Sequence, residues 1–152
     1  MKKNRLLPQT YVMGDLHGNY KGLIEALQKT SFDYETDILY FVGDLCDGIA
    51  NECYQCMEEL LKIKNFFPCM GNHDLFLKKW VLDGVLNRKW LEMNGDKTIE
   101  NLIQYQDYKD LTFKYFEKVK SFYLINSNVI CHGGLDLRKP VNNQKELIFS
   151  IN

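Results

Sequence analysis

The stretch Gly43-Asp44-Leu45-Cys46-Asp47-Gly48 decides the fold, because it places two carboxylates three residues apart, directly after an apolar run. That run, Ile38-Leu39-Tyr40-Phe41-Val42, is typical of a strand buried on both faces. The two carboxylates are therefore expected at the C-terminal end of a strand, where open α/β sheets bind their ligands.

Two similar turns flank this stretch. Gly14-Asp15-Leu16-His17-Gly18 follows the short apolar run 11–13, and Gly71-Asn72-His73-Asp74 follows the run 66–70. Asp15 and Asp44 are 29 residues apart, and Asp44 and Asn72 are 28 apart, which is about one strand-helix-strand unit each time. Three such units would bring all three turns to one edge of a parallel sheet.

Length and composition bound the class of protein. The 152 residues predict a single domain, 1–152, and the net charge of −1 with 45% hydrophobic residues gives no field that would attract nucleic acid or an anionic membrane. The basic segment 1–8 has too short an apolar run for a signal peptide or a membrane span. Five cysteines, an odd number, favour reduced thiols over a disulfide framework. We therefore expect a cytoplasmic protein.

Apolar spacing predicts helices over residues 20–28, 49–64, 75–86, 98–105 and 111–120, with a turn at 90–96. The last three helices are expected to form a helical insertion that serves as a lid or wall. Runs at 122–125 and 128–131, joined by Asn126-Ser127, predict a hairpin that leads to His132-Gly133-Gly134. Cys53 and Cys56 share a helix face and are interpreted as buried apolar side chains, since no second cysteine pair is spaced to complete a zinc site.

The three histidines of the chain all follow an apolar strand and lie in glycine-containing turns, which fits a purely structural role poorly. With the carboxylates and amide beside them they form a set of oxygen and imidazole ligands without thiolate, suited to manganese, iron or zinc. The set is Asp15, His17, Asp44, Asn72 and His132. These five side chains are more ligands than one four-coordinate ion needs. If one carboxylate bridges, the set supports two ions about 3.5–4 Å apart, the arrangement used for in-line phosphoryl displacement.

These residues resemble the calcineurin-like metallophosphoesterases, and within them the phosphoprotein phosphatase branch. The family pattern is GDxHG, GDxxDRG, GNH[ED] and HGG, and the matching pieces begin at Gly14, Gly43, Gly71 and His132. The resemblance runs from about Tyr11 to Pro140. The stretch with Trp90, Asn94-Gly95 and Thr98 is similar to bacterial and phage members of the serine/threonine phosphatase or dinucleoside tetraphosphatase type.

The resemblance implies a fold, a reaction and residue roles. The fold would be an α/β sandwich of two sheets flanked by helices (αββα layers). Asp15 and His17 would hold one metal, Asp44 would bridge, and Asn72 with His132 would hold the second. A hydroxide shared by two divalent ions, Mn²⁺ first with Fe and Zn as alternatives, would be the nucleophile. His73 would be the general acid, oriented by Asp47.

Two departures from the family pattern are visible. The arginine that usually follows Asp47 is replaced by Gly48, so phosphate binding would fall to Arg88, Arg138 or a lysine. The chain stops before the metal-binding histidine that the family carries far downstream, so the C-terminal sheet is expected to be incomplete, and homodimerisation through its exposed edge is one consequence.

Three functions stay open at this point. The first is a metallophosphatase, a hydrolase acting on phosphorylated small molecules, nucleotides such as dinucleoside polyphosphates, or phosphoproteins. The second is a catalytically impaired remnant or binding module that keeps the fold. The third, less favoured, is a phosphodiesterase.

Overall fold

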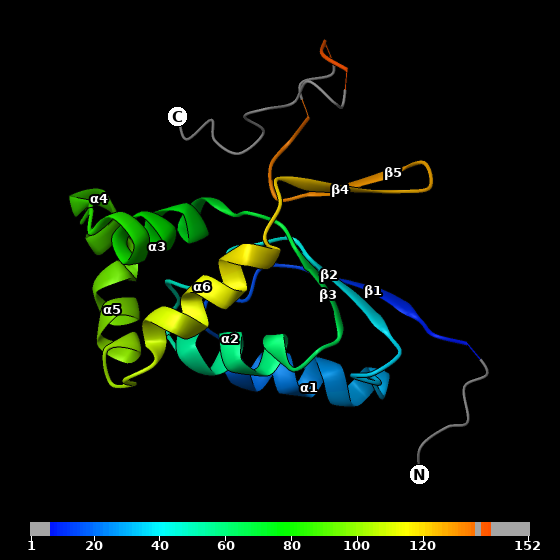
Figure 1. Cartoon of the computed structure of the whole chain (residues 1–152), viewed down its shortest axis with the longest axis horizontal. Coiled ribbons are helices and arrows are strands. Elements are labelled where there is room, and N and C mark those ends of the chain that lie inside the picture. The colour runs from blue at the N-terminus through cyan, green and yellow to red at the C-terminus, as the bar shows by residue number, and fades with distance from the viewer. Residues whose placement is uncertain (1–6, 136–137, 141–152) are drawn as a thin grey trace.

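The protein is described here from a computed structural model, which describes residues 7–135 and 138–140. Its elements follow in the order β1 (Thr10–Met13), α1 (Tyr20–Thr30), β2 (Ile38–Phe41), α2 (Cys53–Leu61), β3 (Asn65–Pro68), α3 (Asn72–Asp83), α4 (Arg88–Trp90), the kinked turn η1 (Leu91–Gly95), α5 (Asp96–Leu102), α6 (Tyr108–Lys118), β4 (Phe122–Ile125) and β5 (Asn128–Cys131) (Figure 1). The predicted α/β class is confirmed. Within the described ranges, no helix is long and apolar enough to cross a bilayer.

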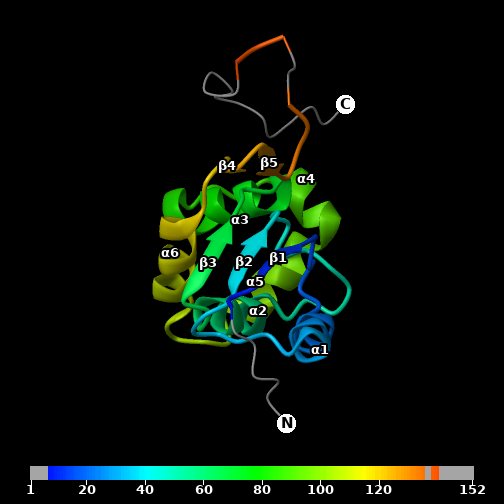
Figure 2. The same cartoon turned by 90° about the vertical axis from the view of Figure 1, so that its right-hand side faces the viewer.

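Three parallel strands form the centre of the molecule. They lie in the order β1-β2-β3 and point the same way (Figure 2). Met13 pairs with Phe41 and Phe41 with Pro68, so the three strands end in register. The three glycine turns consequently leave the sheet at one edge, as the sequence predicts. We call this the strand-end edge, made of residues 14–18, 43–48 and 71–74.

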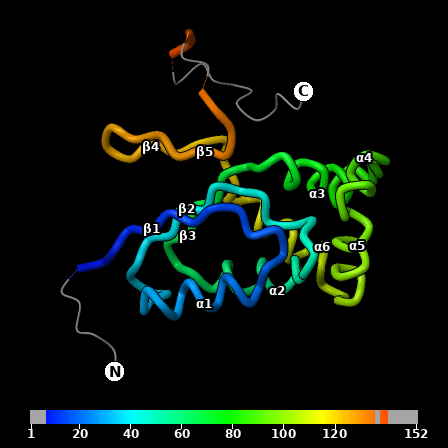
Figure 3. Tube along the Cα trace, turned by 180° about the vertical axis from the view of Figure 1, so that it is seen from behind, coloured from blue at the N-terminus to red at the C-terminus, as the bar shows by residue number. Residues whose placement is uncertain are grey.

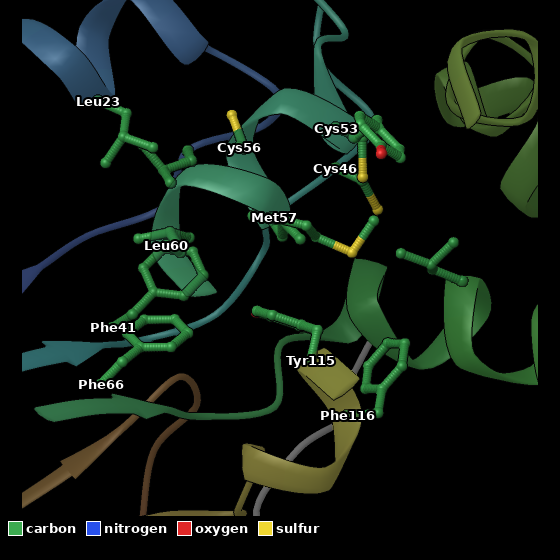
Figure 4. Close-up of a cluster of buried hydrophobic side chains, with 14 of the residues drawn as sticks. Leu23, Phe41, Cys46, Cys53, Cys56, Met57, Leu60, Phe66, Tyr115 and Phe116 are labelled. Atoms are coloured by element: carbon green, nitrogen blue, oxygen red, sulfur yellow. The ribbon is translucent and has the colours of Figure 1, made fainter. Parts of the chain in front are cut away.

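One face of the sheet carries the core. Phe41 of β2 and Phe66 of β3 are buried there against α1, α2 and α6 (Figure 4). Leu39 of β2 belongs to the same buried cluster. Cys53 and Cys56 are fully buried in the same cluster, and burial raises the pKa of the Cys56 thiol, as their interpretation as small apolar side chains requires.

The opposite face of the sheet is only half-buried. The prediction that β2 is buried on both faces is therefore wrong: Ile38 and Tyr40 alternate with the fully buried Leu39 and Phe41. The antiparallel hairpin of β4 and β5 lies over this face (Figure 3). Its Tyr123 ring contacts the rings of Tyr40 and Phe67 at centroid distances of 5.5 and 5.6 Å. The hairpin is confirmed, with Ile125 paired to Asn128 across the predicted connection.

Helix boundaries differ from the sequence prediction in two informative places. Helix α3 begins at Asn72 instead of Leu75, so the third turn of the strand-end edge is the first turn of a helix. The turn predicted at 90–96 is present as a kink at Met93 and Asn94, whose backbone is not helical, but α4 and α5 flank it directly, so residues 88–102 form one kinked segment. We call this segment the insert. The insert packs against the hydrophobic core and covers one side of it, because its side chains Trp90, Thr98 and Leu102 are fully buried.

Candidate metal centre

The strand-end edge is held in a strained backbone conformation. His17, Asp44 and Asp47 are not glycines, yet their φ angles are 47°, 56° and 71°. Such left-handed residues cost about 1–3 kcal/mol each and persist where surrounding contacts fix them. Here the Asp44 carbonyl accepts hydrogen bonds from the backbone N–H groups of Leu16 and His17 at 3.1 and 3.0 Å, which tie the first turn to the second.

Asp74 ties the second turn to the third. Its carboxylate, 0% exposed, accepts the backbone N–H groups of Gly71, Asp44 and Leu45 at 2.9, 2.9 and 3.0 Å. Burial raises the pKa of Asp74 to about 6, although these three hydrogen bonds oppose the rise. Asp74 therefore works as a backbone clamp, a role the sequence reasoning missed. An acidic residue at the third position of a helix, reaching back to the residue before the helix, was the available signal.

His17 presents one ring nitrogen to the carboxylates. Its Nδ1 lies 2.9 Å from the carbonyl oxygen of Cys46, which can only accept, so Nδ1 carries the proton. The lone pair is then on Nε2, which lies 4.0 Å from Asp15 Oδ2 and 4.0 Å from Asp44 Oδ2. A backbone partner that fixes the tautomer and leaves the other nitrogen free is typical of a metal-binding histidine.

His132 arrives from the hairpin and closes the other side of the cluster. Its Nε2 lies 3.1 Å from Asn72 Oδ1 and 3.3 Å from Asp44 Oδ2. The hydrogen bond to Asp44 raises the pKa of His132 against the effect of burial. Nδ1 is buried without a hydrogen-bond partner among the described residues, 3.8 Å from Asp15 Oδ1. An unpartnered nitrogen facing carboxylate oxygens is a position where a cation fits.

The donor atoms form two groups that share one carboxylate. One group is His17, Asp44 and His73, and the other is Asp15, Asp44 and His132; within each group the ligand atoms lie within 4.8 Å of one another. Asp44 Oδ2 lies within 4.0 Å of both His17 Nε2 and His132 Nε2, while Asp44 Oδ1 accepts the backbone N–H of His73 at 3.0 Å. Ligand atoms about 2.1 Å from one cation stand roughly 3–4 Å apart. The five residues predicted from sequence are therefore brought together at separations that suit divalent cations.

The charge of Asp44 is stabilised in place. Burial would raise its pKa, but the hydrogen bonds from His132 and from the His73 backbone N–H outweigh burial and lower the pKa. Asp44 thus carries its negative charge at the centre of the cluster, where a cation needs it.

His73 and Asp47 form a hydrogen-bonded pair beside the cluster. His73 Nδ1 lies 2.8 Å from Asp47 Oδ2, and this bond raises the pKa of His73 against the effect of burial. The His73 ring stands edge-on to the His17 ring, with centroids 5.2 Å apart. The pairing expected from the resemblance is present, and it leaves Nε2 of His73 as the nitrogen without a bond to Asp47.

Two residues of the insert also bind Asp47, and the sequence reasoning gave them no role. Trp90 Nε1 donates to Asp47 Oδ2 at 2.6 Å, and Thr98 Oγ1 donates to Asp47 Oδ1 at 2.6 Å. Both side chains are 0% exposed. Their stretch was noted only as similar to some family members, because nothing in its local pattern indicates a carboxylate partner.

The arginines proposed for phosphate binding are exposed. The Arg88 side chain is 94% exposed and its Nε lies 3.4 Å from Glu92 Oε1, and Arg138 is also exposed. Phosphate binding by Arg88 and Arg138 stays a prediction. The residue after Asp47 cannot be an arginine without a backbone shift, because a Cβ on Gly48 would lie 1.8 Å from the carbonyl oxygen of His17.

A parallel sheet whose strand ends gather carboxylates, histidines and an amide around one shared aspartate defines a metallophosphoesterase fold. The chain belongs to the calcineurin-like phosphoesterase family, whose sequence model matches residues 9–151. The resemblance inferred from the four motifs is confirmed.

Relatives in this family include symmetrical bis(5'-nucleosyl)-tetraphosphatases. The Mannheimia succiniciproducens protein is 39% identical over 69 residues, 45% of this chain and 25% of its own length. The Dechloromonas aromatica protein is 31% identical over 106 residues, 67% of this chain and 35% of its own. The chain therefore spans about a quarter to a third of these relatives.

Two solved structures share the fold. One, provisionally assigned as a diadenosine tetraphosphatase, has a TM-score of 0.66 at 23% identity over 92% of this chain and 60% of its own. The other, a Saccharomyces cerevisiae protein serine/threonine phosphatase, has a TM-score of 0.55 at 21% identity over 85% of this chain and 42% of its own.

Proposed function

We propose that the protein is a metal-dependent phosphoester hydrolase that binds two divalent cations, Mn²⁺ first, on either side of Asp44. The observation that carries the proposal is that one oxygen of Asp44, Oδ2, lies 4.0 Å from His17 Nε2 and 3.3 Å from His132 Nε2. Asp15 and His17 would hold one ion, and Asn72 and His132 the other. When bound, the cations supply positive charge for phosphate oxygens and lower the pKa of an attacking water.

The chain's own residues supply the proton for the leaving group. His73 donates Nδ1–H to Asp47 and presents Nε2 on the side of the donor cluster. The attacking water forms the new bond to phosphorus and releases a proton to solvent, while the bond between phosphorus and the leaving oxygen breaks. The electron pair stays on the leaving oxygen, and Nε2–H gives it a proton. Asp47 keeps the imidazole in this orientation and stabilises its charge. Because water attacks phosphorus directly, no covalent phosphoenzyme is needed.

The substrate class we propose is a phosphorylated small molecule or nucleotide, with a dinucleoside polyphosphate first. Support comes from the tetraphosphatase names of the relatives and the structural likeness to a diadenosine tetraphosphatase. Phosphoproteins are the second choice. A cytoplasmic location and a homodimer stay predictions.

The test is hydrolysis of p-nitrophenyl phosphate and of diadenosine tetraphosphate by the chelator-stripped chain, titrated with Mn²⁺, with bound metal per chain counted in the same samples. Turnover that rises as two metals load is the expected result. Binding of one metal or none, without turnover, would favour the remnant or binding module. Faster cleavage of bis(p-nitrophenyl) phosphate than of the monoester would favour a phosphodiesterase.

A further inference from the structure

The Asp47 carboxylate is fully enclosed and has three side-chain donors. His73 Nδ1 and Trp90 Nε1 lie 2.8 and 2.6 Å from Oδ2, and Thr98 Oγ1 lies 2.6 Å from Oδ1. The Asp47 side chain is 0% exposed, so water cannot replace any of these donors. The orientation of the carboxylate is therefore set by the insert as much as by its own turn.

The two donors from the insert are neutral. An arginine or lysine at either place would neutralise Asp47 and compete with the imidazole for its charge. The indole N–H and the hydroxyl of Trp90 and Thr98 instead stabilise the carboxylate by hydrogen bonds alone. Among the described side chains that hydrogen-bond the Asp47 carboxylate, His73 is then the one group that can bring a positive charge to it.

Thr98 fixes the backbone of Asp47 as well as its side chain. Its Oγ1 accepts the backbone N–H of Asp47 at 3.1 Å while it donates to Asp47 Oδ1. Asp47 has a φ of 71°, a conformation that needs such outside support.

A local break in the insert lets both donors reach one carboxylate. Residues eight apart in a regular α-helix are separated by about 12 Å along the axis. Between Trp90 and Thr98 the helical path is broken at η1, where Met93 and Asn94 have non-helical backbone angles and Asn94 has a φ of 68°. Gly95 then lies under the Trp90 ring, where a Cβ would be 2.5 Å from Cδ2. This kink lets Trp90 and Thr98 reach the same carboxylate.

The Trp90 ring is held on its other sides by aromatic neighbours. Phe76 stacks on it with centroids 6.5 Å apart, and Trp80 contacts it at 6.0 Å. With Gly95 beneath it, the indole is packed at one orientation and its N–H points at Asp47.

From these contacts we propose that Trp90 and Thr98 are positioning residues for proton transfer by His73. They hold Asp47 so that it keeps the proton of His73 on Nδ1 and directs Nε2 to the leaving group. The inference rests on the proposed hydrolase function but assigns roles that the shared family motifs do not contain.

Leaving-group dependence separates positioning from general structural damage. Phenyl phosphate needs protonation of its leaving oxygen, whereas 2,4-dinitrophenyl phosphate releases a stable anion that does not. Trp90→Phe and Thr98→Val should each lower kcat for phenyl phosphate roughly tenfold, the effect of losing one hydrogen bond to a charged group. Changes in kcat for 2,4-dinitrophenyl phosphate should stay under about twofold, since no acid is needed. KM and bound metal per chain should not change.

Three further variants sharpen the test. Thr98→Ser keeps the hydroxyl and should restore turnover of phenyl phosphate. Tyr40→Phe is the aromatic control, because the Tyr40 ring packs against Phe67 and Tyr123 on the half-buried face of the sheet and does not contact Asp47 or Trp90. In a His73→Ala background, Trp90→Phe should cause no further loss, because residues that act through one another are not additive. Equal losses on both substrates, loss of metal, or a full further loss in the His73→Ala background would each overturn the proposal.

A second readout does not depend on turnover. In ¹⁵N-histidine spectra of the metal-free protein, neutral His73 should carry its proton on Nδ1, and Trp90→Phe and Thr98→Val should give a mixture of tautomers. An unchanged tautomer in both variants would overturn the positioning role even if the wild type hydrolysed no phosphoester. Absence of turnover in the wild type together with the expected spectra would instead contradict the proposed function alone.

Discussion

Asp44 and Asp47 stand three residues apart on one turn, yet different regions of the molecule hold them. Asp44 belongs to the strand-end edge: its carboxylate contacts the backbone N–H of His73 and the ring of His132, and its N–H is held by Asp74. Asp47 contacts the same edge through His73, but Trp90 and Thr98 reach it from the insert. One region is built from glycine turns at strand ends, the other from a kinked helical segment. The edge is suited to bind cations, and the insert to orient a proton donor.

The largest effect should come from Asp44→Asn at the edge. It removes the carboxylate shared by both donor groups, so both metals and turnover should be lost. Metal per chain and hydrolysis of p-nitrophenyl phosphate would be measured together. Retention of two metals would contradict the view of Asp44 as the shared ligand.

His73→Ala should separate the two regions. It removes the proton donor, and turnover should fall roughly 10²–10⁴-fold while both metals stay bound. Bound metal per chain and hydrolysis of p-nitrophenyl phosphate would again be measured together. A variant that lost its metals would show that His73, which lies in one of the donor groups, serves as a ligand instead.

Gly48→Ala tests the close contact between the turn that carries Asp44 and Asp47 and the first turn, residues 14–18. Its Cβ would lie 1.8 Å from the carbonyl oxygen of His17, so the His17 backbone must move. Metal affinity should fall about 10–100-fold, the usual range when support of a ligand is lost. Competition with a fluorescent chelator measures it. Unchanged affinity would mean that the edge accommodates the shift.

Asn101→Ala loosens the insert without touching Asp47. Asn101 accepts the backbone N–H of Tyr54 at 2.9 Å and donates to Gln55 Oε1 at 3.1 Å, which joins α5 to α2. The free energy of unfolding should fall by about 1–2 kcal/mol, with bound metal unchanged. Urea denaturation measures the loss, and Gln104→Ala is the control, because among the described residues its side chain hydrogen-bonds the carbonyl of the exposed Glu100. A loss of metal would mean that the insert supports the edge directly.

The smallest effect should come from Glu59, which lies outside both regions. Burial would raise its pKa, but hydrogen bonds from Tyr34 and Lys62 outweigh burial and lower the pKa. A lowered folded-state pKa gives stability that is present above the unfolded pKa, near 4.5, and is lost as pH falls through the folded value. Glu59→Gln should cost roughly 1 kcal/mol or less at neutral pH and flatten this acid dependence, with turnover unchanged. Denaturation at pH 7 and at pH 4 would check it, and an unaltered acid dependence would contradict it.

The sequence by itself determined the strand-end edge. Apolar runs of four or five residues, each followed by glycine and an acidic or amide residue, predict strands and turns from local preferences alone. The spacing of 29 and 28 residues then brings the turns together, because parallel strands joined by helices end at the same side. Asp15, His17, Asp44 and Asn72 follow from this without knowledge of any long-range contact, whereas the position of His132 depends on where the hairpin lies, 60 residues after Asn72.

Only the tertiary structure decided the surroundings of Asp47. Trp90 and Thr98 lie 43 and 51 residues from their partner, and an indole or a hydroxyl in an apolar segment is usual in any core. The sequence predicted a turn where the kink at η1 lies, but not that this kink would bring Trp90 and Thr98 to one carboxylate. The half-buried face of β2 was also not predicted. A hairpin more than 80 residues later covers this face, and the local apolar pattern does not show how completely such a distant segment covers it. Local patterns fix which groups leave a strand end, whereas long-range packing fixes which donors meet them.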